Sequence, residues 1–379
     1  MARKQFLFAS GGWARVFFAL ALVAVGLSGI ALAGQEAPPA ATEPMPPAMP
    51  MEKGTPLIVK VAVNYVDVES FDENAGTFKG TVDVRLRWEV PSLKQADDAL
   101  TDPPKVYRGD DAKAQLANMW VPSIEIVNEK GDPTYQNLGL RIFPNGNVEM
   151  IKRISGEFAT PFEVTRFPFD RQVLQIEPAI RNQTTDAVVL QFDQDDLDFS
   201  YANPDASLNG WTMKTVSLKA EPLKGWYGAM HTRVVAALTV QRLPASVLAS
   251  IFIPLFASLL IPLLAIWLNH MEDGVFAIET FELVNLIIGG LFAVIALNFT
   301  VNQSYSVLSL GDNPVNRLFA LNYTALFLAL LINVLFYRFK VIEGLFGRWV
   351  QEQVYLYLLW AIPVMVFVMA SSVVLVAMA

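Results

Sequence analysis

The chain contains four apolar stretches that are each long enough to cross a lipid bilayer as a helix. A helix needs about 20 apolar residues to span the hydrocarbon core. A soluble domain has no use for even one such stretch, so four of them predict a membrane domain over residues 242–379. The predicted spans cover residues 243–268, 281–301, 318–337 and 354–377.

Charged residues gather ahead of these spans. Only 12 Asp, Glu, Lys and Arg residues follow residue 239, although the chain has 28 basic and 36 acidic residues. Cysteine is absent and histidine occurs twice, which excludes disulfide frameworks, thiolate nucleophiles and Cys/His zinc sites. We therefore expect a polar domain before the membrane domain, with no metal site and no cofactor. The net charge of -8 also argues against a nucleic-acid partner.

The N-terminus has the pattern of a secretory signal peptide. Basic residues precede an apolar run over 16–30, and Ala31-Leu32-Ala33 follows as a small-x-small cleavage pattern. The alternative is a fifth membrane helix, but the run is shorter than a span requires. We predict a signal peptide over 1–33, a disordered Pro-rich tether over 34–54, and a following domain outside the cytoplasm.

Residues 55–241 show the alternation of half-buried strands. Over 77–90 the apolar side chains occupy every second position, with Asp83 and two arginines between them. Similar short stretches recur between turn signals, and a short helix is expected near 110–118. About ten strands in under 200 residues predict an all-β, immunoglobulin-like sandwich outside the membrane.

The connections between the spans give a consistent topology. The connection over 302–316 has no Lys or Arg, whereas Arg338, Lys340 and Arg348 follow the third span. Basic residues favour the cytoplasmic side, so the third connection is predicted inside and the second outside. An even number of spans places the C-terminus outside as well.

The second span carries polar and small residues on one helical face. Spacings of three and four residues join the members of this face, and Glu279 lies one turn earlier. Polar groups within a bilayer usually face a bundle interior or water, so this face is a candidate pore lining. The alternative is that the glutamates favour the helix dipole and that Gly289 and Gly290 pack against a neighbour. The face consists of Glu282, Asn285, Gly289, Phe292, Ala296 and Phe299.

The segment Phe167-Pro168-Phe169-Asp170-Arg171-Gln172 resembles the FPFDxQ signature of the pentameric ligand-gated ion channels, also called Cys-loop receptors. Trp120-Val121-Pro122 and Phe143-Pro144-Asn145-Gly146 keep the order and approximate spacing of that family. Arg242 resembles the arginine that ends the family's last strand, and Pro254 resembles the proline of its first membrane helix. The resemblance covers about residues 55–379.

The absence of cysteine makes the chain similar to bacterial members, which lack the disulfide. In this chain, Thr160 and Leu174 flank the loop that the disulfide closes in animal members of the family. This resemblance implies a homopentamer in the bacterial inner (plasma) membrane, in contact with membrane lipid. It also implies that the N-terminal domain and the C-terminus lie on the periplasmic side.

In such a pentamer each pore-lining residue becomes a ring of five. A ring of Glu282, with Glu279 beside it, would concentrate cations, so we expect selectivity for monovalent cations. Asn285 would form a polar constriction beyond which Gly289 lies. Phe292, Ala296 and Phe299 would form a hydrophobic gate that closes by dewetting.

The resemblance also implies a small extracellular ligand, bound between neighbouring sandwiches. An ammonium would suit aromatic faces and carboxylates, and protons and divalent cations remain alternatives. Glu125 and Glu177 have the alternative role of pairing with strand arginines. The positions that match the family's binding loops are Glu125, Glu177, Ala179, Trp226 and Tyr227, with Asp83 on the complementary face.

Coupling between the two domains is expected at Phe167, Pro168, Phe169, Asp170, Arg242 and Pro254. Asp170 and Arg242 carry opposite charges and, by family resemblance, meet at the boundary between the domains. If they are partly desolvated, removal of either partner leaves a costly unpaired charge. The alternative is a solvated surface pair that contributes about 0 to 1 kcal/mol.

Two other functions compete with a channel. A membrane-anchored ligand sensor without conduction would need no polar face on the second span and would need a cytoplasmic output domain. An integral-membrane enzyme would need a cluster of catalytic side chains, a metal-ligand set or a phosphate loop, and the sequence presents none. We therefore expect an ion channel rather than an enzyme.

Overall fold

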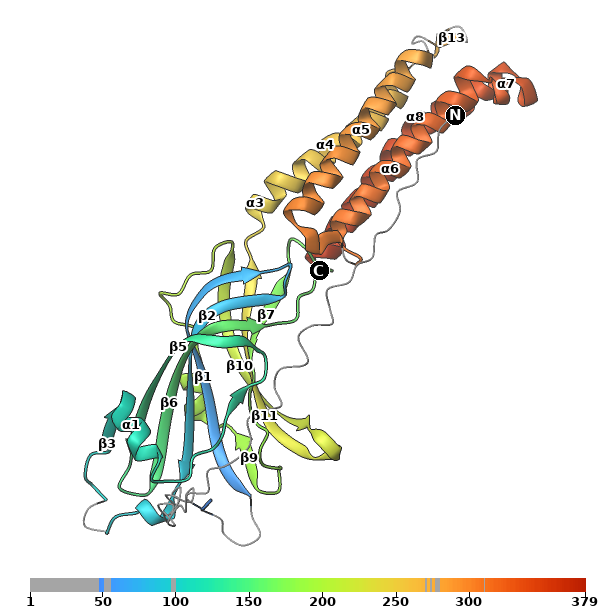
Figure 1. The fold of residues 1–379 in the computed structure, drawn as a ribbon. Coiled ribbons are helices and arrows are strands. Elements are labelled where there is room, and N and C mark those ends of the chain that lie inside the picture. The colour runs from blue at the N-terminus through green and yellow to red at the C-terminus, as the bar shows by residue number, and fades with distance from the viewer. Residues whose placement is uncertain are drawn as a thin grey trace, which may run out of the picture. The chain divides into compact units, whose positions relative to one another are not determined.

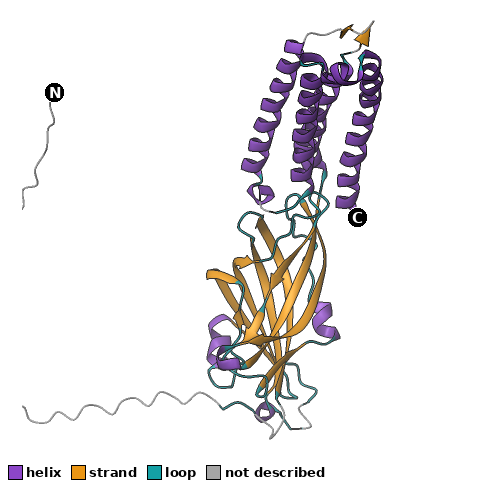
Figure 2. Cartoon of the chain, turned by 90° about the vertical axis from the view of Figure 1, so that its right-hand side faces the viewer, coloured by secondary structure: helices purple, strands orange, loops and turns teal. Residues whose placement is uncertain are grey.

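The computed structural model describes residues 48–50, 56–96, 100–269, 271–272, 275–276, 280–309 and 311–379. The predicted signal peptide and most of the predicted tether lie outside the described residues. Strands and the long helices occupy separate parts of the chain, as Figures 1 and 2 show.

Eleven strands form two sheets in the described part of the N-terminal region. The first sheet has the order β3-β5-β6-β2-β1-β9, in which β1 and β9 are parallel. The second has the order β10-β11-β8-β4, and β7 also pairs with β11. The strands are β1 (Leu57–Asp72), β2 (Thr77–Glu89), β3 (Lys105–Arg108), β4 (Glu125–Ile126), β5 (Glu129–Ile142), β6 (Asn147–Ala159), β7 (Arg171–Ile176), β8 (Pro178–Ile180), β9 (Val188–Gln191), β10 (Trp211–Lys224) and β11 (Met230–Arg242).

The two sheets enclose one apolar core. In β2 the alternate residues Val82, Val84, Leu86 and Trp88 are all buried, as their period of two predicts. Tyr65 of β1 crosses between the sheets, where its hydroxyl lies 2.8 Å from the carbonyl oxygen of Leu174 and 2.9 Å from that of Ala236. Burial raises the pKa of this hydroxyl, although hydrogen bonds to backbone oppose the rise.

Two short helices border the sheets. The first, α1 (Gly109–Leu116), was expected from the sequence. The second, α2 (Gln194–Phe199), begins with a capping box, because the Asp193 side chain accepts from the Asp196 amide while the Asp196 side chain accepts from the Asp193 amide.

The C-terminal region is helical. A short helix α3 (Ala245–Val247) continues through a π-helical turn, Leu248–Phe252, into α4 (Ile253–Trp267). A second π-helical turn, Asn333–Arg338, follows helix α6. The remaining elements are β12 (Met271–Glu272), β13 (Val275–Phe276), α5 (Thr280–Ser304), α6 (Pro314–Ile332), α7 (Val341–Phe346) and α8 (Arg348–Met378), with a 3-10 turn at Ser306–Ser309.

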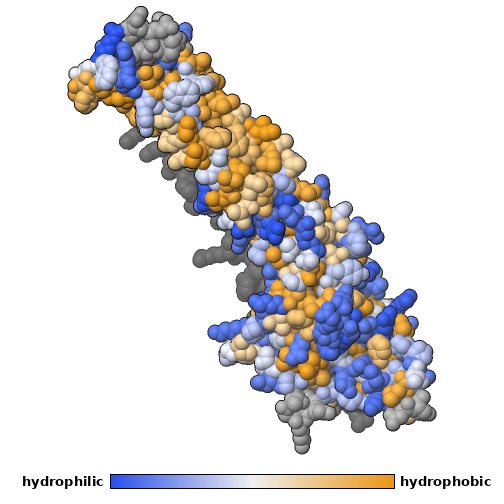
Figure 3. Space-filling model, turned by 180° about the vertical axis from the view of Figure 1, so that it is seen from behind, coloured by the Kyte–Doolittle hydropathy of each residue, from blue (hydrophilic) through white to orange (hydrophobic). Residues whose placement is uncertain are grey.

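Four helices of the described chain are long and apolar enough to cross a membrane: Ala245–Trp267, Phe281–Ser304, Pro314–Arg338 and Arg348–Met378. Their surface is largely apolar in Figure 3, whereas the strand region on the same face is mostly hydrophilic. The predicted fold, a β-sandwich followed by four membrane-spanning helices, is therefore confirmed.

The sequence prediction differed from the structure in local detail. Strand β3 was not predicted, because four residues are too few to establish an alternating pattern. In the apolar stretch over 121–127, only Glu125–Ile126 forms a strand. Pro122 has no amide hydrogen to give to a ladder, which disfavours pairing there.

Candidate functional site

Arg242, the last residue of β11, is held by two carboxylates. Its Nε donates to Asp170 Oδ1 at 2.7 Å, and its Nη2 lies 3.2 Å from Asp170 Oδ2. Its Nη1 and Nη2 donate to the carboxylate of Glu73 at 2.7 and 2.9 Å. The side chains of Arg242 and Asp170 are only 5% and 3% exposed, so this is a buried ion pair and not a solvated surface pair.

Two aromatic rings complete the surroundings of Arg242. The guanidinium carbon lies 4.2 Å from the centre of the Trp211 ring and 4.8 Å from that of Phe167. Burial lowers the pKa of Arg242, but the hydrogen bonds that it donates to Glu73 and Asp170 outweigh this effect and raise the pKa overall. The guanidinium therefore stays charged at every physiological pH.

The same cluster contacts the helical region. Phe167 is fully buried, and its ring lies edge-on to that of Tyr305, with 5.9 Å between centres. Asn74, the neighbour of Glu73 in the turn between β1 and β2, accepts from Ser306 Oγ at 2.7 Å and from the Val307 amide at 3.0 Å. One strand turn thus contacts both Arg242 and the connection between α5 and α6.

The loop that carries the FPFDRQ segment is closed without a disulfide. Thr160 Oγ1 donates a short hydrogen bond to the carbonyl oxygen of Val173, next to the buried Leu174. Within the loop, Pro168 is buried and follows a cis peptide bond, and Phe169 is half-buried. Pro254 is the second residue of α4, just after the π-helical turn.

Some of the predicted ligand-binding residues come together at the tip of β10 and β11. Glu125 and Trp226 both line a cavity of about 380 Å³, together with Arg181, Lys224 and His231. Glu125 lies 3.5 Å from the guanidinium of Arg181, and both side chains are about half exposed.

The residues that form this tip differ in backbone conformation and in exposure. Tyr227 adopts a positive φ of 55° and, like Trp226, is almost fully exposed. Gly225 lies against His231, since a Cβ atom there would lie 2.3 Å from the imidazole. The tip therefore presents two aromatic side chains on a backbone that His231 supports.

The other predicted ligand-binding residues lie outside this cavity. Ala179 is fully buried and pairs with Glu125 across β4 and β8. Glu177 forms an ion pair with Arg233 at 2.8 Å. Asp83 belongs to the other sheet, where it accepts two hydrogen bonds from Arg153 at 2.7 and 2.8 Å.

The predicted pore face of α5 is exposed along its described length. Every member of the face, from Glu282 to Phe299, is exposed in the protomer, while Glu279 lies outside the described residues. Phe292 and Phe299 are 67% and 65% exposed, against 38% for Leu291. The buried residues of α5 lie on the opposite side of the helix, at spacings of four, three, four and seven residues: Leu283, Ile287, Gly290, Val294 and Val301.

The two adjacent glycines of α5 have different surroundings. A Cβ atom at Gly290 would lie 2.7 Å from Ile261 of α4 and 3.2 Å from Leu326 of α6. A Cβ atom at Gly289 would meet no neighbour within 4 Å. Packing against other helices thus accounts for Gly290 and not for Gly289.

Several residues of these sites were not predicted from the sequence. Glu73 sits in a turn with no periodic pattern, and only its proximity to Arg242 in the fold identifies it. Trp211 had a detectable signal, because it starts the strand that pairs with the end of β11, and the register places it opposite Arg242. Arg181 and His231 become visible only when the loops meet around their cavity.

Comparison with known proteins agrees with this architecture. A family model described as the neurotransmitter-gated ion-channel ligand binding domain matches residues 45–244. A proton-gated ion channel of Gloeobacter violaceus is 26% identical over 288 residues, which are 76% of this chain and 73% of the relative.

Animal receptors match over a smaller part. The glycine receptor subunit beta of Homo sapiens is 25% identical over 59% of this chain and 45% of the receptor. The gamma-aminobutyric acid receptor subunit theta of Mus musculus is 21% identical over 57% of this chain and 33% of the receptor. The chain thus spans less than half the length of these receptors.

The family match covers more than half of the chain, and the β-sandwich and four apolar helices agree with it. The absence of cysteine fits the bacterial type. This chain belongs to the neurotransmitter-gated ion-channel family, the pentameric ligand-gated channels, and its family is one of ion channels and not of enzymes.

Proposed function

We propose that the chain forms a homopentameric cation channel that opens when a small extracellular ligand binds. The observation that carries the proposal is the exposed face of α5, which lies opposite the stripe that packs on α4 and α6. Five copies arranged around an axis would turn this face toward a common pore. A tethering helix would have no reason to keep Glu282, Asn285 and Gly289 on its free side.

Charge selectivity is assigned to the start of α5. Glu282 is exposed at the first turn of the helix, and Glu279 precedes it in the sequence. A ring of five carboxylates attracts cations into the pore mouth and repels anions. Monovalent cations are the proposed permeant ions.

The hydrophobic gate is assigned to the other end of the same face. Phe292 and Phe299 project from α5, with Ala296 between them. Rings of apolar side chains exclude water when the pore is narrow, so a small rotation or tilt of α5 would switch conduction. Asn285 forms the polar constriction nearer the carboxylate ring.

The agonist site is assigned to the cavity around Glu125 and Trp226 at the tip of β10 and β11. The exposed Trp226 and Tyr227 can cover a ligand or contact a neighbouring subunit, whose Asp83 would approach from the complementary side. Amines, protons and divalent cations are the ligand classes to be compared. Arg242 with Asp170, Phe167, Pro168, Phe169 and Pro254 would pass the movement to α4 and α5.

The proposed location is the bacterial inner membrane, with the sandwich and the C-terminus on the periplasmic side. The connection containing Ser306–Ser309 has no basic residue, and Arg338, Lys340 and Arg348 lie at the opposite ends of the spans. This charge distribution agrees with the positive-inside rule.

The experiment is a measurement of reversal potential in a salt gradient, on channels in planar bilayers. Glu282→Gln should shift the reversal potential toward the equilibrium potential of the anion, because each pentamer loses five carboxylates at the pore mouth. Glu343→Gln is the matched control, since Glu343 is an acidic residue of α7 and not of α5. An unchanged reversal potential in Glu282→Gln would refute the assigned pore mouth.

A further inference from the structure

Tyr355 of α8 is a buried tyrosine in an apolar helical region, with only 2% of its surface exposed. Its hydroxyl lies 2.7 Å from the carbonyl oxygen of Ile266 and makes a shorter hydrogen bond to that of Asn269. A buried hydroxyl without a partner is costly, since apolar side chains and lipid tails cannot replace water as a partner. The hydroxyl of Tyr355 avoids this cost by donating to the end of α4.

The carbonyl groups at the end of α4 need such a donor. The last four carbonyls of a helix have no amide partner within that helix, and Ile266 belongs to the last turn of α4. Asn269 follows the end of α4 and is fully buried. Tyr355 therefore acts as a C-terminal cap of α4 that comes from a different helix, and its one proton is shared between two acceptors.

Tyr355 is itself held by other helices. Its ring lies against those of Phe336 and Tyr337, with 6.0 Å between centres in both cases, and these two residues belong to the π-helical turn that follows α6. One turn earlier on the same face of α8, Gln351 is also 2% exposed, and its Oε1 accepts from the Glu343 amide of α7 at 2.9 Å. This face of α8 thus joins the ends of α4, α6 and α7, which fixes the hydroxyl of Tyr355 relative to all three.

The surroundings of Tyr355 allow its hydroxyl to be tested separately from its ring. Trp360 of α8 lies edge-on to Trp267 of α4, with 5.7 Å between ring centres, so the two helices keep a contact when the hydroxyl is removed. Tyr357, two residues further along α8, projects from the opposite side of the helix and is 73% exposed. It provides the same chemical change without the contact to α4.

The capped end of α4 leads into α5, the proposed pore helix. After Asn269 the chain forms the hairpin of β12 and β13, in which Met271 pairs with Phe276, and reaches α5 at Thr280. Figure 1 shows this hairpin at the ends of α4 and α5 that lie away from the strands. Glu282 belongs to the first turn of α5. The position of Asn269 therefore sets where the connection to that first turn begins.

We propose that Tyr355 is a positioning residue for the pore mouth. By capping the end of α4 from α8, its hydroxyl fixes the start of the α4–α5 connection and so holds Glu282 in the ring of carboxylates. Tyr355 is buried within the protomer and acts only through α4. The inference rests on the proposed function, in which Glu282 lines the mouth, and its first test is independent of conduction.

The first test is hydrogen–deuterium exchange of the full-length channel in detergent, followed in peptides that cover residues 268–280. Tyr355→Phe removes the hydroxyl and keeps the ring, so exchange in this connection should become about two- to tenfold faster, the factor for one net hydrogen bond. Tyr357→Phe is the matched control and should leave the exchange unchanged, because Tyr357 lies on the exposed side of α8. Gln351→Leu should speed exchange in α7 and not in the connection.

The second test is the reversal potential in a salt gradient, which does not depend on how many channels fold. Tyr355→Phe should shift it in the same direction as Glu282→Gln and by a smaller amount, because the carboxylates remain but are less well placed. The double variant Tyr355→Phe/Glu282→Gln should match Glu282→Gln alone, since Tyr355 acts through that ring. Tyr357→Phe should match the wild type.

Faster exchange over 268–280 together with the smaller shift in Tyr355→Phe supports the proposal. Unchanged exchange overturns it, and so does a reversal potential that stays at the wild-type value in Tyr355→Phe while Glu282→Gln shifts it. If Tyr355→Phe does not assemble, the hydroxyl serves the fold itself and the positioning role is wrong. A reversal potential that Glu282→Gln leaves unchanged refutes the proposed pore mouth first, and the inference falls with it.

Discussion

Replacing Arg242 by glutamine tests whether the buried ion pair holds the end of the sandwich together. The change leaves two carboxylates, Asp170 and Glu73, without the four hydrogen bonds that Arg242 donates. Removing one partner of a buried pair costs about 3 to 5 kcal/mol. The Asp170 side chain is only 3% exposed, which favours that range, and the 17% exposure of Glu73 lets water relieve part of the cost. We expect a loss of about 4 kcal/mol from the free energy of unfolding.

The neighbouring substitutions should cost less, in a fixed order. Asp170→Asn keeps the Glu73 pair and an amide oxygen near Arg242, so its cost should be about 2 kcal/mol. Glu73→Gln removes the more exposed carboxylate and should cost about 1 kcal/mol. Arg181→Gln is the matched control, because Arg181 is half exposed and its partner Glu125 lies 3.5 Å away; its cost should be below about 1 kcal/mol.

The assay is denaturant unfolding of the full-length channel in detergent, followed by tryptophan fluorescence, since Trp211 lies against the Arg242 guanidinium. The double variant Arg242→Gln/Asp170→Asn should be less destabilised than the sum of its two single variants, because no buried carboxylate remains at residue 170. Additivity within about 0.5 kcal/mol would refute the direct interaction. A cost for Arg242→Gln as small as that of Arg181→Gln would refute the argument from burial.

Two further predictions concern the helix face and the sandwich. Gly290→Ala should lower the melting temperature of the solubilised channel, because the new methyl group would lie 2.7 Å from Ile261. Gly289→Ala should leave the melting temperature unchanged, since a Cβ atom there meets no neighbour. Equal effects of the two substitutions would contradict the difference in packing. Burial raises the pKa of Glu129, and among the described residues its Oε1 has no hydrogen-bond partner, so the folded state loses stability as the pH rises through the folded pKa. Glu129→Gln should therefore raise the melting temperature at neutral pH and have little effect below the ordinary glutamate pKa; a pH-independent effect would show that ionisation is not the cause.

Periodicity was enough to predict the main elements. The alternation of Val82, Val84, Leu86 and Trp88 marked the buried face of β2, because strand side chains alternate and the core lies on one side. The spacing of polar and small residues on α5 predicted which side of that helix would be free. It could not distinguish Gly289 from Gly290, since that difference depends on where Ile261 and Leu326 lie.

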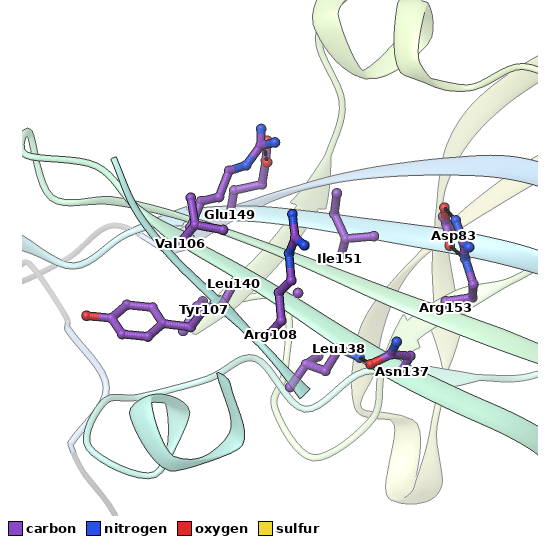
Figure 4. A pocket seen from close by; sticks show the side chains of 12 residues that line it. Asp83, Val106, Tyr107, Arg108, Asn137, Leu138, Leu140, Glu149, Ile151 and Arg153 are labelled. Atoms are coloured by element: carbon purple, nitrogen blue, oxygen red, sulfur yellow. Dashed lines mark hydrogen bonds and ion pairs between the residues drawn. The ribbon is translucent and has the colours of Figure 1, made fainter. Parts of the chain in front are cut away.

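Cross-strand and loop contacts could not be predicted in the same way. The sequence identified Asp170 and Arg242 through the family signature but gave no signal for Glu73, which comes from a turn some 170 residues before Arg242. The ion pairs across the six-stranded sheet, such as that of Asp83 with Arg153 in Figure 4, depend on the register of its strands, and turn geometry sets that register. Asp83 was predicted to face a ligand, and its ion pair with Arg153 was visible only once that register was known.

The turn between β1 and β2 places two neighbouring residues in contact with different partners. Glu73 receives hydrogen bonds from Arg242, and Asn74 receives them from Ser306 and Val307. A residue inserted between Glu73 and Asn74 would lengthen the chain by up to about 3.5 Å. It would move apart two sets of contacts that consecutive residues now make. The length of this turn therefore matters more than the identity of its exposed Ala75, and deletion or insertion there would uncouple the strands from the helices while leaving each of them folded.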